Sequence, residues 1–176
     1  MLRRYKGVFI METERLTLRQ MTEDDEDNLM QIFSDRVAMQ YYTSTKTREQ
    51  AKNWIQWNAR NYEEHGVGLW ICEWKDTGEF VGQCGIVPQL VDEQPEMEIG
   101  YLFVRAYWGR GLATEAALAA KQHGFTAMGR NRLISMIYKP NLPSIQVAKR
   151  IGMSLEKETR INNRETFIFS VHAKND

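Results

Sequence analysis

The amino-acid sequence predicts a single mixed α/β domain. Its 176 residues suit one domain that is large enough to bury a core. Hydrophobic periodicity predicts the order strand, helix, helix, strand, strand, strand, helix, strand, helix, strand, strand. No linker, repeat or low-complexity tract divides the sequence. We therefore assign residues 11–176 to the domain, and residues 1–10 to an N-terminal extension that could add an edge strand.

The first predicted strand, at Leu16–Leu18, is followed by two helices with capping boxes. Thr22 precedes an acidic turn with Asp25 at the third helical position, and Thr47 stands in the same relation to Gln50. Each helix carries an apolar stripe at helical spacing, which predicts one buried face. The stripes are Leu29, Ile32 and Phe33 in the first helix, and Ala51, Trp54, Ile55, Asn58 and Tyr62 in the second.

Three strands are predicted after the glycines that end the second helix. Leu69–Trp74 and Phe80–Val87 form a hairpin around Asp76-Thr77-Gly78. Residues 88–95 are predicted to be a polar loop, and Glu96–Val104 is the next strand. Alternation along that strand separates two faces. Met97, Ile99, Tyr101 and Phe103 form one face, and Glu96, Glu98 and Gly100 form the other.

The stretch Trp108–Thr114 forms a glycine-rich turn that leads from this strand into a helix ending near Phe125. Glycines let the backbone approach a ligand, and the first N–H groups of a helix have no intrahelical partner. The helix dipole adds positive character at the same end, so the turn predicts a site for a phosphate or pyrophosphate. A dinucleotide fingerprint fits less well because Thr114 replaces the third glycine.

The last third of the chain predicts a strand, a short helix and a hairpin. The strand is Leu133–Tyr138, and Asn141 caps a helix that stops at Gly152. Two final strands, near Leu155–Thr159 and Thr166–His172, are joined through Asn162-Asn163.

Composition excludes several classes of protein. Lys+Arg and Asp+Glu both number 23, which disfavours binding to nucleic acid or to an anionic membrane. No run is long enough to span a membrane and the N-terminus lacks the apolar region of a signal peptide, so we expect a cytoplasmic protein. Cys72 and Cys84 could form a cross-strand disulfide, but two reduced, buried thiols fit better. The three histidines are too scattered for a metal site.

These motifs together resemble the GNAT superfamily of acetyl-CoA-dependent N-acetyltransferases, over Thr13 to about Phe169. Within it, the chain is most similar to the branch of ribosomal-protein N-terminal acetyltransferases and spermidine acetyltransferases. The resemblance implies a single GNAT-like domain whose central sheet splays in the middle. It is carried by residues 12–19 (ETERLTLR), 98–101 (EIGY), 108–116 (WGRGLATEA), 141–144 (NLPS) and 149–153 (KRIGM).

The resemblance also implies where acetyl-CoA would bind. The pyrophosphate would lie on main-chain N–H groups of the glycine turn, although Trp108 stands where the family has Gln or Arg. The main chain of the preceding strand end would pair with the pantetheine amides, and Asn141 would contact the pantetheine arm from the other side. The implied contacts are Leu102, Phe103, Val104, Gly109, Arg110, Gly111, Leu112, Ala113, Thr114 and Asn141. No metal is expected.

The resemblance makes Glu98 the candidate general base, with Glu96 as the second choice. Its plain alternative is a solvated or salt-bridged strand glutamate. Many members carry a tyrosine acid at the position of Ala148, which cannot donate a proton, so Ser144 becomes the candidate general acid. Ser144 could instead be a first-turn residue that bonds the backbone, and the thiolate could leave unaided or take a proton from water.

The predicted function is transfer of an acetyl group from acetyl-CoA to a primary amine by direct attack on the thioester. The amine could belong to a peptide or protein N-terminus, a polyamine or another small molecule. Tyr41, Tyr42 and Trp70 are the predicted walls of the acceptor site. Trp54, Trp57, Trp70 and Trp74 fit a core or cleft wall better than a base-stacking platform. The alternative is a non-catalytic acyl-CoA sensor or interaction module. The protein is expected to be a monomer or a homodimer.

Overall fold

The computed structural model describes residues 7–174 and contains one eight-stranded sheet with four α-helices. The strands lie in the order β1-β2-β3-β4-β5-β6-β8-β7, and each neighbouring pair is antiparallel except β5 with β6. The strands are β1 (Phe9–Glu12), β2 (Leu16–Gln20), β3 (Leu69–Trp74), β4 (Phe80–Val91), β5 (Gln94–Phe103), β6 (Arg132–Tyr138), β7 (Ser154–Ile161) and β8 (Arg164–His172).

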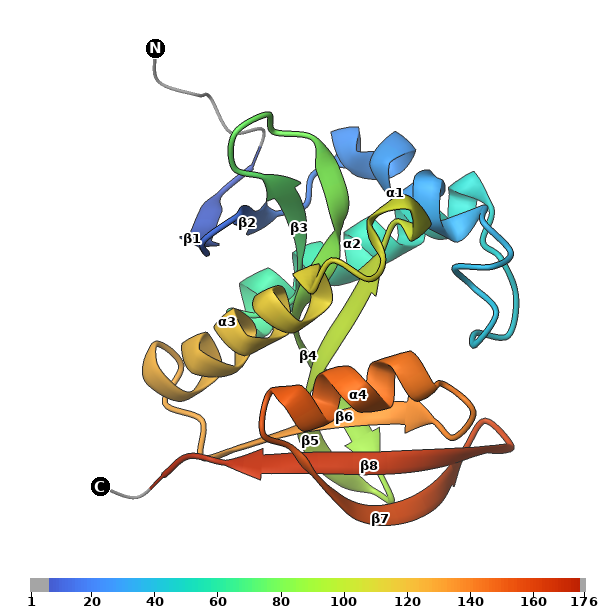
Figure 1. Ribbon diagram of the computed structural model, residues 1–176, viewed down its shortest axis with the longest axis vertical. Helices are drawn as coiled ribbons and strands as arrows, with labels where there is room; N and C mark the ends of the chain where they lie inside the picture. The colour runs from blue at the N-terminus through green and yellow to red at the C-terminus, as the bar shows by residue number, and fades with distance from the viewer. Residues whose placement is uncertain (1–6, 175–176) are drawn as a thin grey trace.

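The helices cover both faces of the sheet (Figure 1). They are α1 (Glu26–Phe33), α2 (Arg48–His65), α3 (Leu112–Thr126) and α4 (Leu142–Arg150), with 3-10 turns η1 (Glu23–Asp25) and η2 (Arg105–Tyr107). One core cluster joins α3 and α4 to the sheet, and a second joins α1 and α2 to the opposite face. Fully buried Ala116, Ala117 and Ala120 let α3 lie close to the strands. Both predicted capping boxes, at Thr22 and Thr47, are confirmed.

The sheet splays between β5 and β6. These parallel strands share one registered pair, Glu98 with Ile134, among the residues that the structure describes. By contrast, β4 and β5 pair continuously from Gly82 with Phe103 to Val91 with Gln94. The predicted mixed, splayed sheet is therefore confirmed, and the end of β5 is left with an open side.

The predicted polar loop at residues 88–95 is wrong, because these residues complete the β4–β5 hairpin. The turn is Asp92-Glu93, both with positive φ (48° and 65°), which suits a tight hairpin but lacks the usual glycine or asparagine. Pro88 and Pro95 are tolerated because this end of the hairpin extends beyond the pairing of β3 with β4 and of β5 with β6. A proline in a strand that has one free side costs no ladder hydrogen bond when its nitrogen faces that side.

At the N-terminal edge, β1 pairs with β2, so the predicted boundary between residues 10 and 11 falls inside β1. Residues 1–6 of the predicted extension lie outside the described residues. Cys72 and Cys84 are both buried free thiols, and burial raises the pKa of each.

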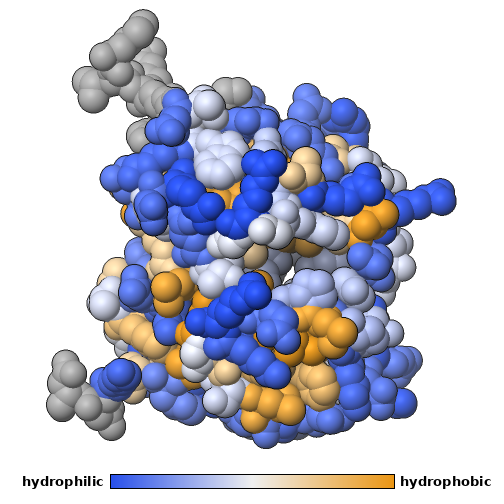
Figure 2. All heavy atoms as spheres, in the orientation of Figure 1, coloured by the Kyte–Doolittle hydropathy of each residue, from blue (hydrophilic) through white to orange (hydrophobic). Residues whose placement is uncertain are grey.

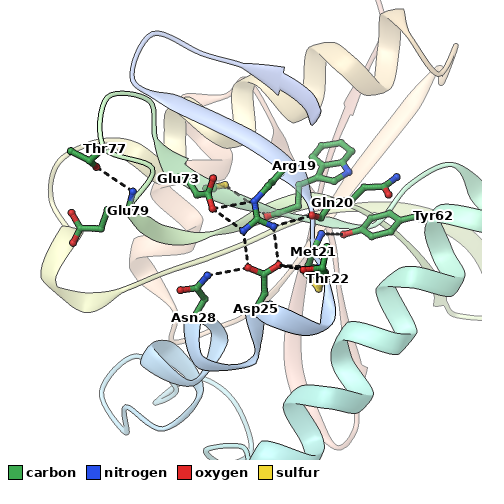
Figure 3. A network of polar contacts seen from close by, with 12 residues as sticks. Arg19, Gln20, Met21, Thr22, Asp25, Asn28, Tyr62, Glu73, Thr77 and Glu79 are labelled. Carbon is green, nitrogen blue, oxygen red and sulfur yellow. Dashed lines mark hydrogen bonds and ion pairs between the residues drawn. The ribbon is translucent and has the colours of Figure 1, made fainter. Parts of the chain in front are cut away.

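A buried polar cluster ties the first helical segment to the sheet (Figure 3). Arg19 on β2 is 1% exposed and donates to Asp25 at 2.7 and 2.8 Å and to Glu73 on β3 at 2.7 Å. Burial alone would raise the pKa of Asp25, but hydrogen bonds from Arg19 and Thr22 outweigh it and lower the pKa. Asp25 also accepts from the side chain of Asn28 in α1, at 3.0 Å. The start of α1 is thereby held against β2 and β3.

Candidate functional site

A cavity of about 490 Å³ lies at the open side of β5. Its walls come from the end of β5, the glycine turn, the start of α4 and the segment before α2. Figure 2 shows the hollow near the middle of the face that carries α4. We call it the first cavity. Among its lining residues are Leu102, Phe103, Gly109, Gly111, Leu112, Ala113, Thr114, Asn141 and Ser144, all predicted site residues, together with Tyr41 and Tyr42.

The glycine turn presents the N-terminus of α3 to the first cavity. Gly109 and Gly111 have φ of 75° and 76°, values that L side chains rarely adopt. Gly111 is the N-cap of α3 and no side chain caps the helix, so its first N–H groups remain open to a ligand. Thr114 lines the same cavity, and its buried Oγ1 has no hydrogen-bond partner among the described residues. The turn therefore offers several unused groups to an anion.

Residues of the β1–β2 turn hold the glycine turn from behind. Glu115 in the first turn of α3 accepts from Arg15 Nε at 2.7 Å and from Thr13 Oγ1 at 2.6 Å. Arg15 Nη1 also donates to the carbonyl of Arg110 at 3.0 Å. The backbone of the turn is thus fixed before any ligand arrives.

Two predicted contacts, Arg110 and Val104, do not line the first cavity. The guanidinium of Arg110 lies over the Tyr107 ring instead, 5.4 Å from its centroid. The N–H of Val104 donates to the Val81 carbonyl at 2.9 Å, and the residue packs with the core on the α1 and α2 side. Sequence reasoning gave no such role to Trp108, which lines the cavity and donates from Nε1 to the Phe103 carbonyl at 2.9 Å.

The start of α4 forms the wall opposite the glycine turn. Asn141 caps this helix by accepting from the N–H of Ser144 at 3.2 Å. Tyr101 on β5 donates its hydroxyl to the carbonyl of Ser144 at 2.8 Å. Ala148, at the position of the family tyrosine, is fully buried in the core. The phenol that contacts this wall therefore belongs to Tyr101 on β5, and α4 supplies none at position 148.

A second cavity of about 390 Å³ lies between β4, β5 and the α1–α2 segment. We call it the second cavity. Tyr42, Tyr101 and Leu102 line both cavities, so the two meet at the end of β5. The other lining residues are Phe33, Met39, Lys46, Trp54, Trp57, Leu69, Gln83, Val87, Gln89, Glu98, Gly100 and Met136.

Glu98 is the one carboxylate that lines the second cavity. Burial raises its pKa to about 7, and hydrogen bonds from Gln89 (2.7 Å) and from the N–H of Met136 (3.3 Å) partly oppose that shift. No cation pairs with Glu98 among residues 7–174. Glu96, the second choice, is instead bound by Arg132 at 2.9 Å and lines neither cavity. The salt-bridged alternative thus describes Glu96 and not Glu98.

The three residues predicted to line the acceptor site lie in different places in the structure. Tyr42 lines both cavities, and the residue is 42% exposed. Tyr41 lines the first cavity. The assignment of Trp70 is wrong: its side chain is 1% exposed and packs edge-on against His123 of α3, with ring centroids 5.3 Å apart. Both faces of β3 are buried, so the sequence could not indicate which face looks into a cavity.

Sequence reasoning missed Lys46, Gln83 and Gln89, which supply polar atoms to the second cavity. No local motif marks them, because each comes from a different segment. Within the described part of the chain, no three His, Cys, Asp or Glu side chains are grouped to hold a metal. None of the helices described is long and apolar enough to cross a membrane.

The model of the acetyltransferase (GNAT) domain family matches residues 15–154. The chain belongs to the GNAT acetyltransferases. It is 43% identical over 158 residues to the uncharacterized protein YkkB of Bacillus subtilis, which covers 89% of this chain and 92% of YkkB. The uncharacterized N-acetyltransferase YoaA of the same organism is 32% identical over 149 residues, or 84% of each chain. A crystal structure of an acetyltransferase from Agrobacterium tumefaciens has a TM-score of 0.83 at 26% identity, covering 98% of this chain and 99% of that one.

Membership of the GNAT acetyltransferases assigns the general activity. The protein is an acetyl-CoA-dependent acetyltransferase.

Proposed function

We propose that this GNAT enzyme transfers the acetyl group to a primary amine that enters the second cavity, with Glu98 as its general base. The observation that carries the proposal is the position of an unpaired carboxylate with a pKa of about 7 next to the first cavity. Such a pKa lets Glu98 accept a proton near neutral pH and still be regenerated. The shared wall at Tyr42, Tyr101 and Leu102 would bring amine and thioester together.

Acetyl-CoA is proposed to occupy the first cavity. Its pyrophosphate would accept from the open N–H groups at Gly111, Leu112 and Ala113, and the unpartnered Oγ1 of Thr114 would add a fourth contact. The pantetheine arm would extend along the open side of β5 at Leu102 and Phe103, as an added strand does, with Asn141 opposite. Asn141 Oδ1 already caps α4, which leaves Nδ2 to donate.

The reaction is a direct transfer. Glu98 takes one proton from the ammonium group, and the neutral amine nitrogen attacks the thioester carbonyl. The C–N bond forms as the carbonyl becomes a tetrahedral oxyanion, and its collapse breaks the C–S bond. As the intermediate collapses, the nitrogen loses its second proton to solvent. Ser144, on the wall of the first cavity, is the proposed donor of the proton that the departing thiolate takes, and exchange with water returns Ser144 and Glu98 to their starting protonation states. The products are the N-acetylated amine and CoA.

The test compares Glu98→Gln with the matched variant Glu96→Gln. The amide is nearly isosteric but cannot accept the proton, so we expect Glu98→Gln to lower kcat by roughly 100-fold or more while the Kd for acetyl-CoA stays within about twofold. Glu96→Gln should keep turnover near the wild-type rate, because Glu96 lines neither cavity. Release of free CoA measures turnover. Wild-type kcat in Glu98→Gln would remove Glu98 from the mechanism.

A further inference from the structure

The second cavity has an uneven distribution of charge. Glu98 is its one acidic side chain and Lys46 its one basic side chain. Between them the walls are aromatic or aliphatic, with Phe33, Trp54 and Trp57 among them. A cavity of about 390 Å³ suits a small molecule, and such a wall would hold an apolar body between two charged ends.

Lys46 is a half-buried cation without an anionic partner. Its Nζ lies 5.6 Å from the ring centroid of Trp54 and 5.8 Å from that of Phe33. No carboxylate lies within 4.0 Å of it in the part of the chain that the structure describes, whereas Arg48 and Lys52 nearby both pair with Glu26. The backbone N–H of Lys46 donates to the Phe33 carbonyl at 2.9 Å, which fixes the residue at the cavity.

A buried amide adds a second hydrogen-bond donor. Gln83 is 1% exposed, and its Oε1 accepts from Trp54 Nε1 at 3.0 Å. That bond commits the carbonyl oxygen, so the free end of the amide is the Nε2 donor. Lys46 and Gln83 each contact the Trp54 side chain, and both line the second cavity. A cation together with an amide donor suits a carboxylate or a phosphate.

We propose that the acceptor is a small amine that also carries one anionic group, with its amine at Glu98 and its carboxylate or phosphate at Lys46. The proposal rests on the proposed function for the amine end alone. A polyamine fits poorly, because its second ammonium group would find no further carboxylate and would meet Lys46. The apolar body of the acceptor lies along the aromatic walls.

The experiment uses the full-length enzyme and four acceptors: para-(aminomethyl)benzoate, its methyl ester, para-(aminomethyl)phenyl phosphate and spermidine. Release of CoA gives kcat/KM for each. In the wild type we expect at least one of the two anionic acceptors to exceed the ester and spermidine by tenfold or more. Comparing kcat/KM for the benzoate with that for the phenyl phosphate shows whether the site prefers a carboxylate or a phosphate.

Variants then assign the preference to Lys46. Lys46→Met keeps the aliphatic stem and should lower kcat/KM for the preferred anionic acceptor by tenfold or more, while the ester changes by less than twofold. Lys46→Arg should retain most of the preference. Lys52→Met removes a charge outside the cavity and is the matched control. The inference would be overturned if Lys46→Met lowered kcat/KM equally for the acid and the ester. It would also be overturned if the wild-type enzyme preferred the ester or spermidine.

Binding separates this inference from the proposed function. Trp54 and Trp57 line the second cavity, so quenching of tryptophan fluorescence in the presence of CoA reports the Kd of each acceptor. If no amine is turned over but the anionic compounds still bind tenfold more tightly than the ester, the proposed function fails and the anionic subsite stands. If amines are turned over but the acid and the ester bind with the same Kd, the proposed function stands and the anionic subsite fails.

Discussion

The first and second cavities meet at β5 but are built from different parts of the chain. The first cavity presents main-chain groups: a helix N-terminus, a glycine turn and the open side of a strand. The second presents side chains from α1, α2, β4, β5 and the segment before α2. Main-chain groups suit a ligand common to a whole family, whereas side chains can change from one member to the next without disturbing the fold. If acetyl-CoA occupies the first cavity and the acceptor the second, as proposed, the second cavity would set specificity for the acceptor.

The largest expected effect is on the main-chain cavity. Gly111→Val places a β-branched residue at a φ of 76°, so we expect the turn to rearrange and the Kd for acetyl-CoA to rise by roughly 100-fold. The added Cβ itself has room, with Arg15 Nη2 3.7 Å away, so backbone strain at this φ is the expected cause. Calorimetric titration measures the change. Gly129→Val, at a similar φ of 61° but away from both cavities, is the control, and equal losses in both variants would argue against the site.

The second expected effect is a loss of stability when the buried Arg19–Asp25 pair, which holds the start of α1 against the sheet, is broken. Asp25→Asn leaves buried Arg19 with Glu73 alone, and breaking a buried pair costs about 3 kcal/mol. The lowered pKa of Asp25 means that its contribution is present above the unfolded value and is lost as pH falls through the folded one. Urea unfolding of the wild type should therefore show a loss of stability below about pH 4.

The same variant sharpens the comparison of the cavities. In Asp25→Asn the KM for the acceptor should rise more than the Kd for acetyl-CoA, because the cluster supports α1 and not the glycine turn. A larger loss on the acetyl-CoA side would show that the two cavities are not independent.

The third effect is on the pH dependence. Burial raises the pKa of Glu98 to about 7 in the free enzyme, and the ionised form is the base, so log(kcat/KM) should rise by one unit per pH unit below that value and level off above it. Glu98→Gln should abolish this limb. The wild-type limb is expected well above that of an exposed glutamate, and a limb near pH 4.5 would contradict the burial of this carboxylate.

The smallest effect is expected at Ser144. Ser144→Ala should lower kcat by about tenfold with little change in the Kd for acetyl-CoA, if its hydroxyl protonates the thiolate. The defect should shrink with acyl donors whose thiol is more acidic. Ser154→Ala, at an exposed position on β7, is the control. A defect that is equal across donors would make Ser144 a positioning residue.

The main-chain features of the first cavity could be predicted from the sequence because they depend on short local patterns. The glycines at 109 and 111, the cap at Asn141 and the alternation along β5 all lie within a few residues of the groups they define. The sequence also placed Glu98 on the face opposite Ile99, which the structure confirms.

The second cavity could be predicted far less well. Lys46 and Gln83 each contact Trp54 through tertiary packing, and no spacing in the chain indicates those contacts. Trp70 lines neither cavity, and the sequence could not show this because a strand buried on both sides gives no alternation to follow. The Asp92-Glu93 turn adopts positive φ without glycine or asparagine, so the hairpin was interpreted as a loop.

The splay between β5 and β6 has a consequence for hydrogen exchange. The sheet consists of a five-stranded block, β1 to β5, and a three-stranded block, β6 to β8, which share the single pair of Glu98 with Ile134. A cosubstrate lying along the open side of β5 would act as a partner that both blocks contact. Amides of β5 and β6 would then exchange more slowly with solvent in the presence of CoA, including some that never touch it. In this protein the ligand would complete the sheet.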